Sequence, residues 1–143
     1  MDEKQMTITK LDTFADETAG QDMLRYIGLP ALLGHEKDSL LYFMGKQLAR
    51  NIEYDSLEDV YYIFQKLRWG NLELIKEKRQ QIILHLMSDD IVRRLSSPIE
   101  TEFRLESGFI AESFQKITQR KTECFETINQ RLYRVEFKVY FTD

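Results

Sequence analysis

The chain has 143 residues, of which 43% are hydrophobic and 31% charged, a balance too apolar for a disordered protein and too charged for a membrane protein. Its net charge of -4 argues against a nucleic-acid partner held by bulk charge. One cysteine excludes an internal disulfide, and with only two histidines besides we expect no bound metal and no cofactor.

The chain shows no targeting signal and no internal boundary. Residues 1–6 lack the basic and then apolar pattern of a signal peptide. The most apolar stretch, residues 26–34, is far shorter than the roughly 20 residues of a membrane helix. We therefore expect a cytoplasmic protein without membrane insertion. Because no linker or repeat divides the chain, it predicts one domain over residues 15–143 behind a flexible arm at residues 1–14.

Helical periodicity dominates the first part of the chain. A first helix is expected to end within residues 22–27, because Gly28 and Pro30 follow and disfavour its continuation. A second helix should run over about residues 38–51, with Asp38 or Ser39 as its cap. Its apolar residues follow the 3/4 spacing of one buried stripe, namely Leu40, Leu41, Met44, Leu48 and Ile52.

A third helix is predicted to begin at Asp55 or Ser56 and to end near Gly70. After it, apolar residues recur at every second position, which is typical of strands. Alternation around a charged turn at residues 77–79 predicts a β-hairpin, and strict alternation over residues 135–141 predicts a second one with residues 123–128. Between the hairpins we expect three short elements, which are a helix at 89–95, a strand at 102–105 and a helix at 108–119 with Ser107 as its cap.

This order of elements predicts an α+β fold, in which N-terminal helices cover a twisted antiparallel sheet of about four to five strands. The third helix should present one apolar face, and the first hairpin one inward face. The residues of the helix face are Leu57, Val60, Tyr61, Phe64 and Leu67, and those of the hairpin are Leu72, Leu74, Ile82, Leu84 and Leu86.

Reactive side chains do not combine into a catalytic motif. His35 lies at a helix junction with no second histidine or cysteine near it in sequence, so a solvated loop residue is favoured over a general base or a ligand. Cys124 is flanked by Glu123 and Glu126, whose charges raise a thiol pKa and oppose activation. Phosphate-binding, metalloprotease and serine-hydrolase motifs are missing as well. We therefore expect that the protein is not an enzyme.

Small and basic residues mark two of the helices. Lys46 and Arg50 lie one turn apart on one face, which is either a solvated surface or a site for an anion or an acidic partner. Gly45 costs about 1 kcal/mol relative to alanine inside a helix, so we expect a close backbone approach there. Gly108 and Ala111 form a similar ridge on the later helix, where close helix packing is again favoured.

Four short motifs together resemble one known family. They are Leu29-Pro30 with Leu32-Leu33-Gly34, Tyr42 with Gly45-Lys46 and Leu48-Ala49-Arg50, Trp69-Gly70 with Leu72, and Phe103 with Leu105-Glu106 and the run from Gly108 to Glu112. In this order they cover roughly residues 20–141, and the chain resembles the YslB-like family of uncharacterised Firmicutes proteins. That family is similar in fold to the TRAPP (transport protein particle) subunits, the 4-vinyl reductase domain and the haem-binding H-NOX sensors.

The resemblance implies a TRAPP-like fold in which the helix that begins near Gly108 packs against the sheet. Members of the wider group bind haem, small ligands or an acyl chain in an apolar cavity, or act as dimeric scaffolds. This chain lacks the Tyr-x-Ser-x-Arg motif for haem propionates and the cysteines for metal, and Cys124 lies near the C-terminus rather than in the N-terminal helices. These departures argue against carrying over the haem, metal and acyl chemistry.

The preferred hypothesis is a non-enzymatic protein-interaction or adaptor domain that acts as a homodimer. Ile83, His85 and Met87 share one face of a strand and form the expected dimer face, although a ligand role of His85 is an alternative. The second hypothesis is a sensor that holds a small apolar ligand or lipid in an internal cavity. Ligand or partner contacts are expected from Tyr42, Lys46, Arg50, Trp69, Glu106 and Glu112.

Overall fold

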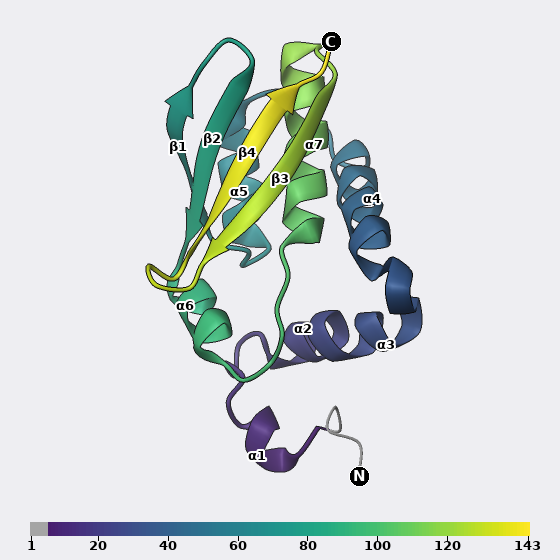
Figure 1. Ribbon diagram of the computed structural model, residues 1–143, viewed down its shortest axis with the longest axis vertical. Coiled ribbons are helices and arrows are strands. Elements are labelled where there is room, and N and C mark those ends of the chain that lie inside the picture. Colours follow the sequence, from purple (N-terminus) through teal and green to yellow (C-terminus); the bar gives the residue numbers. More distant parts are fainter. Residues whose placement is uncertain (1–5) are drawn as a thin grey trace.

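The structure, a computed structural model, describes residues 6–143 (Figure 1). Short helical elements come first, which are α1 (Ile8–Leu11), α2 (Ala19–Asp22), the π-helical η1 (Met23–Gly28), α3 (Leu29–Leu33) and the 3-10 turn η2 (Gly34–Glu36). The longer elements follow in the order α4 (Lys37–Arg50), α5 (Leu57–Lys66), β1 (Asn71–Glu77), β2 (Gln81–Met87), α6 (Asp89–Ser96), α7 (Arg104–Thr118), β3 (Thr122–Asn129) and β4 (Arg134–Phe141).

The four strands form one antiparallel sheet in the order β1-β2-β4-β3. Two hairpins meet in its middle, where β2 pairs with β4 and Leu84 lies opposite Phe137. In Figure 1, α5 and α7 lie behind the sheet and α4 lies beside α7, while the other face of the sheet is turned toward the viewer. The predicted α+β class is therefore confirmed, and the four strands fall within the expected four to five.

The core lies between the sheet and the two helices behind it. Phe109 of α7 is its centre, with its ring centroid 5.9 Å from that of Phe64 and 5.5 Å from that of Trp69. These rings occupy the interior between the helices and the strands. The buried apolar residues of the strands follow the alternation of the sequence, and they are Leu72, Ile82, Leu84, Leu86, Cys124, Val135, Phe137 and Val139.

Helix α4 has nearly the predicted bounds, but its predicted buried stripe is wrong. Only Leu41 of that stripe is fully buried, whereas the exposed fractions of its other members lie between 36% and 43%. The stripe members turned toward solvent are Leu40, Met44, Leu48 and Ile52, and the buried residues of the helix are Leu41, Tyr42, Gly45 and Ala49.

Two glycines, Gly45 of α4 and Gly108 of α7, account for this orientation of α4. A Cβ atom on Gly45 would collide with the carbonyl oxygen of Leu105, and one on Gly108 would collide with the carbonyl oxygen of Tyr42. The helices α4 and α7 therefore touch backbone to backbone, and the close approach predicted at both glycines is confirmed. Because only small side chains fit this contact, α4 turns Gly45 and Ala49 inward, and Leu40, Met44 and Leu48 stay exposed.

The N-terminal segment, which comprises α2, η1 and α3, stays helical where the sequence predicted the end of a helix. The π-helical η1 runs through Gly28 directly into α3, so the expected end at residues 22–27 is wrong. Pro30 is the second residue of α3 and follows directly after the π-helical turns of η1. Helix α1, capped by the Thr7 side chain, falls within the predicted arm. Residues 1–5 lie outside the described residues, and the flexibility of the arm stays a prediction.

Helix α7 is longer than predicted. It begins at Arg104, so the strand predicted at residues 102–105 does not form. Ser107, predicted as the cap, lies inside the helix and is completely buried. Its hydroxyl donates a hydrogen bond to the Glu126 carboxylate on β3, at 2.7 Å. Because the Glu126 carboxylate satisfies the Ser107 hydroxyl, Ser107 fits within the helix although its residue type is typical of a cap.

Candidate functional site

Tyr42 and Lys46, two of the six residues predicted to contact a ligand or partner, meet at the edge of the sheet. The Tyr42 hydroxyl donates to the Glu123 carboxylate at 2.8 Å and accepts the backbone N–H of Cys124 at 3.1 Å. The Lys46 ammonium binds the same Glu123 oxygen at 2.7 Å. Partial burial raises the Glu123 pKa, but these two hydrogen bonds outweigh it and hold the pKa below its ordinary value of 4.5. The cluster ties α4 to the edge strand β3.

The other four predicted residues lie elsewhere. Arg50 forms an ion pair with Glu112 of α7, at 3.1 Å between Nη2 and Oε1. Trp69 is 4% exposed and belongs to the core. Glu106 is completely buried and binds Arg25 of the π-helical segment. The structure therefore does not bring the six residues together into one site.

A buried network of charged side chains joins the N-terminal segment to α7. Arg25, which is 5% exposed, donates from Nη1 to Glu106 at 2.7 Å and from Nε to Glu102 at 3.1 Å. Its Nη2 reaches both carboxylates as well. Burial by itself lowers the Arg25 pKa, but the Glu106 charge beside it holds the pKa above its ordinary value. This guanidinium therefore stays charged and bridges two acidic side chains.

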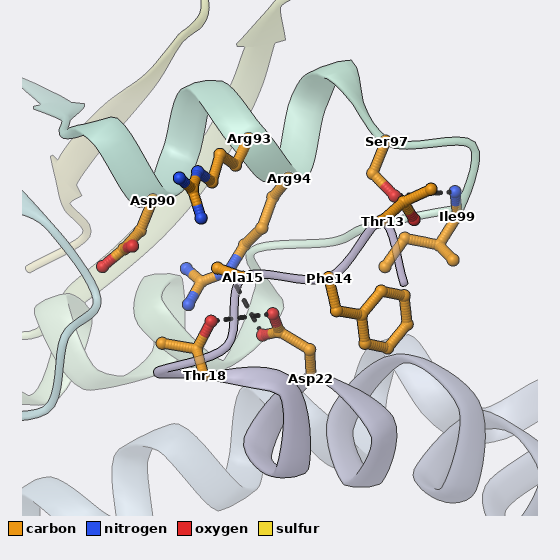
Figure 2. A pocket seen from close by; sticks show the side chains of 10 residues that line it. All are labelled: Thr13, Phe14, Ala15, Thr18, Asp22, Asp90, Arg93, Arg94, Ser97 and Ile99. Carbon is orange, nitrogen blue, oxygen red and sulfur yellow. Dashed lines mark hydrogen bonds and ion pairs between the residues drawn. The ribbon is translucent and has the colours of Figure 1, made fainter. Parts of the chain in front are cut away.

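A second buried pair lies next to this network, between the N-terminal segment and α6. Arg94 and Asp22 are 4% and 3% exposed, and Arg94 Nε lies 3.3 Å from Asp22 Oδ1. Figure 2 shows that the Thr18 hydroxyl also reaches the Asp22 carboxylate, and this hydrogen bond measures 3.0 Å. Arg94 also donates from Nη2 to the carbonyl oxygen of Arg68, at 3.4 Å.

A pocket surrounds this pair. Figure 2 shows that Arg94 comes from α6 and Asp22 from α2. Phe14 and Ala15 come from the loop between α1 and α2. The pocket adjoins an open groove of about 490 Å³, and four lining residues are common to both. The shared residues are Thr13, Phe14, Arg93 and Ser97, and the groove adds Asp12, Asp16, Ser96 and Pro98. It is thus a polar hollow with a buried ion pair beside it.

The outward face of α4 is the most apolar exposed surface of the longer helices. It carries Phe43, which is 62% exposed, together with Leu40, Met44, Leu48 and Ile52. The residues at the remaining positions of this face, Gln47 and Asn51, are uncharged. Their side chains are bonded within the helix, since Asn51 donates to the Gln47 carbonyl oxygen and Gln47 accepts from Arg50. We call these seven residues the α4 face.

The predicted dimer face lies on the open side of the sheet. His85 is 9% exposed, and its Nε2 lies 3.2 Å from a Glu136 oxygen on β4. Met87 is 44% exposed and Ile83 is half-buried. This surface is more polar than the α4 face, because the strand pairing places Lys138 opposite Ile83. Its role in a dimer stays a prediction.

Cys124 has no features of a reactive thiol. It is completely buried in the sheet, and burial raises its pKa well above the ordinary value. The structural role predicted for it agrees with this placement. Within the part of the chain that the structure describes, three or more His, Cys, Asp or Glu side chains do not gather as metal ligands. In the same residues, none of the helices is both long and apolar enough to cross a membrane.

No pattern in the sequence indicates that Asp22, Arg25 and Arg94 are buried. Asp22 and Arg25 are three residues apart and share a helix face, a spacing that usually marks a solvated ion pair. A signal for the α4 face was present, however. Gly45 and Ala49 lie one turn apart, and small residues at that spacing indicate the face where two helices pack closely.

The whole domain matches a known family. The family described as "protein of unknown function (DUF2507)" matches residues 18–140, and the chain belongs to it. One relative is the uncharacterized protein YslB of Bacillus subtilis, which is 34% identical over 118 residues, or 82% of this chain and 80% of YslB. The predicted YslB-like family is thereby confirmed. A more distant relative, the uncharacterized protein MJ1642 of Methanocaldococcus jannaschii, is 23% identical over 73% of this chain and 64% of its own length.

Two solved structures share the fold. A vinyl-4-reductase family protein from Methanocaldococcus jannaschii superimposes with a TM-score of 0.60 at 19% identity, over 100% of this chain and 99% of that one. A mutant H-NOX protein from K. algicida, in its Fe(II) unliganded form, gives 0.54 at 13% identity, over 95% and 85%. The fold likeness predicted for these two groups is confirmed. At such identities it concerns the fold alone, and the TRAPP likeness stays a prediction.

Proposed function

We propose that this protein is a non-enzymatic interaction domain that acts as a homodimer, and that the α4 face is its contact surface. The observation that carries the proposal is the exposure of five large apolar side chains along α4 and the turn that follows it, without a charged residue among them. Their exposed area is on the order of 400 Å², within the range of the largest apolar patch of a typical monomer, and such patches are often functional.

A second copy of the chain suits this surface for reasons of symmetry. A two-fold axis near Gln47 would set two antiparallel α4 helices against each other, with Leu40 and Phe43 of one copy facing Leu48 and Ile52 of the other. Between Leu40 and Ile52 such a contact buries no unpaired charge, because Lys46 and Arg50 are paired with Glu123 and Glu112. Two-fold dimers are also the commonest assemblies of soluble proteins. A different partner protein would need an apolar surface that matches the α4 face. A second copy of this chain carries such a surface itself.

Analytical ultracentrifugation of the full chain tests the proposal. The unaltered protein should sediment as a dimer, and Phe43→Glu should sediment as a monomer with an unchanged circular dichroism spectrum. Tyr62→Glu is the matched control, because Tyr62 is 64% exposed on α5 and lies outside the α4 face. A monomer at high concentration would refute the homodimer. Dissociation by Met87→Glu but not by Phe43→Glu would instead move the contact to the sheet.

A ligand sensor is the second candidate, and the fold shared with an H-NOX protein is the observation that favours it. The ring cluster of Phe64, Trp69 and Phe109 lies where an apolar ligand between helices and sheet would sit. Such a ligand would have to displace these rings. Native mass spectrometry of the freshly purified protein checks this candidate, since a mass equal to the bare chain would count against it.

A further inference from the structure

Two neighbouring rows of opposite charge cross the outer face of the sheet, which is the face turned toward the viewer in Figure 1. The basic row consists of residues that pair across the four strands, which are Lys76, Ile83, Lys138 and Phe125. The acidic row consists, in the same order of strands, of Glu73, His85, Glu136 and Thr127. Both rows point outward, because they alternate along the strands with buried residues such as Leu84 and Phe137.

Most charges of these rows have no partner within the chain. Among residues 6–143, Lys76, Lys138 and Glu73 form no ion pair. Glu136 is paired with His85, but its side chain is 32% exposed, so its carboxylate is open to a further cation. Phe125, which is 57% exposed, adds an apolar side chain to the basic row. The outer face therefore presents unpaired charges of both signs to a partner.

A second copy of the chain matches this arrangement by symmetry. A two-fold axis that lies between the two sheets and crosses the strands between the rows exchanges the rows and keeps the order of the strands. Each residue of the basic row then faces the acidic-row residue of the same strand in the other copy. The pairs formed in this way, each of them twice, are Lys76 with Glu73, Ile83 with His85, Lys138 with Glu136, and Phe125 with Thr127. Every lysine of the rows thus meets a carboxylate.

Other orientations of the two sheets lose this match. A two-fold axis along the strands would set Lys138 of one copy against Ile83 of the other and leave the lysines without carboxylates. The angle of about 30° between packed sheets shifts mainly the edge strands, because they lie farthest from the axis. Lys138 and Glu136 belong to β4, a central strand, so their pairing is the one that this angle disturbs least.

The size of the outer face indicates how strong such a contact is. Four strands about 4.8 Å apart, with eight residues that rise about 3.3 Å each, give a footprint of roughly 500 Å² per copy. The total of about 1,000 Å² lies at the low end of specific protein interfaces. The contact is therefore weak, and because it depends on ion pairs at a solvent-accessible surface, salt weakens it further.

We propose that the outer face of the sheet is a second contact surface for another copy of this chain, in which Lys138 and Lys76 of each copy bind Glu136 and Glu73 of the other. This contact does not involve the α4 face, so it forms or fails independently of the proposed homodimer. A dimer joined through the α4 face still has two outer sheet faces, and the second contact extends its association beyond two copies at high concentration.

Analytical ultracentrifugation of Phe43→Glu isolates the sheet contact, because this substitution removes the α4 contact. At low micromolar concentration the variant should be a monomer. At high micromolar concentration and low salt it should form reversible pairs, and these should separate at about 1 M salt, where the Debye length is about 3 Å. A monomer under all these conditions, or pairs that salt does not affect, would overturn the proposal.

Charge reversal in the same Phe43→Glu background tests the position of the axis. Lys138→Glu sets carboxylates against carboxylates, and Glu136→Lys sets lysines against lysines, so neither variant should pair with itself. An equimolar mixture of the two restores both ion pairs and should associate again. If a substitution in β4 prevents folding, Lys76→Glu and Glu73→Lys on the exposed strand β1 replace the two variants. Pairing of Lys138→Glu with itself, or a mixture that stays monomeric, contradicts the proposed contact.

A matched control separates the two contact surfaces. Lys66→Glu reverses a charge at an exposed position of α5, away from both surfaces, and should leave the pairing unchanged. In the chain with Phe43 intact, Lys138→Glu should remove only the association beyond the dimer. A dimer that survives Lys138→Glu and is separated by Phe43→Glu supports the α4 contact whatever the outcome at the sheet.

Discussion

Helix α4 packs directly against α7, whereas the N-terminal segment reaches α7 through the Arg25 side chain, and the two contacts rest on opposite chemistry. At the α4 contact, Gly45 and Gly108 bring two backbones together with no side chain between them. At the other contact, Arg25 is inserted between Glu102 and Glu106 and holds them through charged hydrogen bonds. The first contact depends on the absence of atoms and the second on the pairing of charges. Each should therefore fail under a different kind of substitution.

The glycine contact should be the more sensitive of the two. Gly108→Ala adds one methyl group that collides with the carbonyl oxygen of Tyr42, so the helices must separate and the core beneath them loosens. We expect a loss of about 4 kcal/mol or more in the free energy of unfolding, measured by chemical denaturation. The matched control is Gly20→Ala, where a Cβ meets nothing within 4 Å. That substitution should be neutral or stabilise α2 by up to about 1 kcal/mol.

The charged contact should break more locally. Arg25→Met leaves the fully buried Glu106 carboxylate without its cation, and removal of one partner from a buried ion pair costs about 3 to 5 kcal/mol. Hydrogen exchange should show that α2, η1 and α3 lose protection while β2 and β4 keep it. Arg25→Lys should be intermediate, because it keeps the charge and loses the forked geometry.

The exposed control Arg131→Met should change stability by less than about 0.5 kcal/mol. Simultaneous loss of protection in the sheet and in the N-terminal segment would remove the distinction between the two contacts.

A third contact, between α4 and β3, also depends on charged hydrogen bonds but is more exposed, and it should have the smallest effect. Glu123 accepts hydrogen bonds from Tyr42 and Lys46, and its pKa is held below the ordinary value of 4.5. The stability that it adds is therefore complete above that ordinary value and is lost as the pH falls through the lower folded pKa. Because the Glu123 side chain is 41% exposed, we expect less than about 1 kcal/mol.

Acid unfolding curves measure this effect. The unaltered protein should lose more stability below pH 4.5 than Glu123→Gln does, because glutamine has no proton to gain. Glu77→Gln, at an exposed position of β1, should leave the acid curve unchanged. Identical curves for the unaltered protein and Glu123→Gln would mean that this contact does not hold α4 to the sheet edge.

Local patterns in the sequence predicted most elements of the sheet and the helices beside it. Ser56 caps α5 as expected, since its hydroxyl accepts the N–H of Asp59. Both hairpins form with the predicted inward faces, because alternation and turn residues act within a few positions of one another. The start of α7 is the exception. Residues 102–105 have a strand-like pattern, but Arg104 and Leu105 belong to α7 and residues 102–103 to the loop before it.

The candidate sites depended on contacts that no local pattern records. Glu106 was predicted as a contact residue, but its partner Arg25 lies 81 residues away in the chain. Asp22 and Arg94 come together across a similar distance, and both would be ordinary surface residues on isolated helices. Such charges are buried only because separate helices pack together. The same packing brings the opposite charge beside each of them.

The sequence by itself therefore determined the family, the α+β class and the close approach of two helices at Gly45 and Gly108. These properties rest on short-range periodicity and on residues that fit only one backbone environment. Tertiary structure decided which face of α4 is buried and which charged side chains leave the solvent. The reason is physical, because an apolar helix face is covered only where another element lies against it, and α7 accepts the small face and leaves the large one exposed.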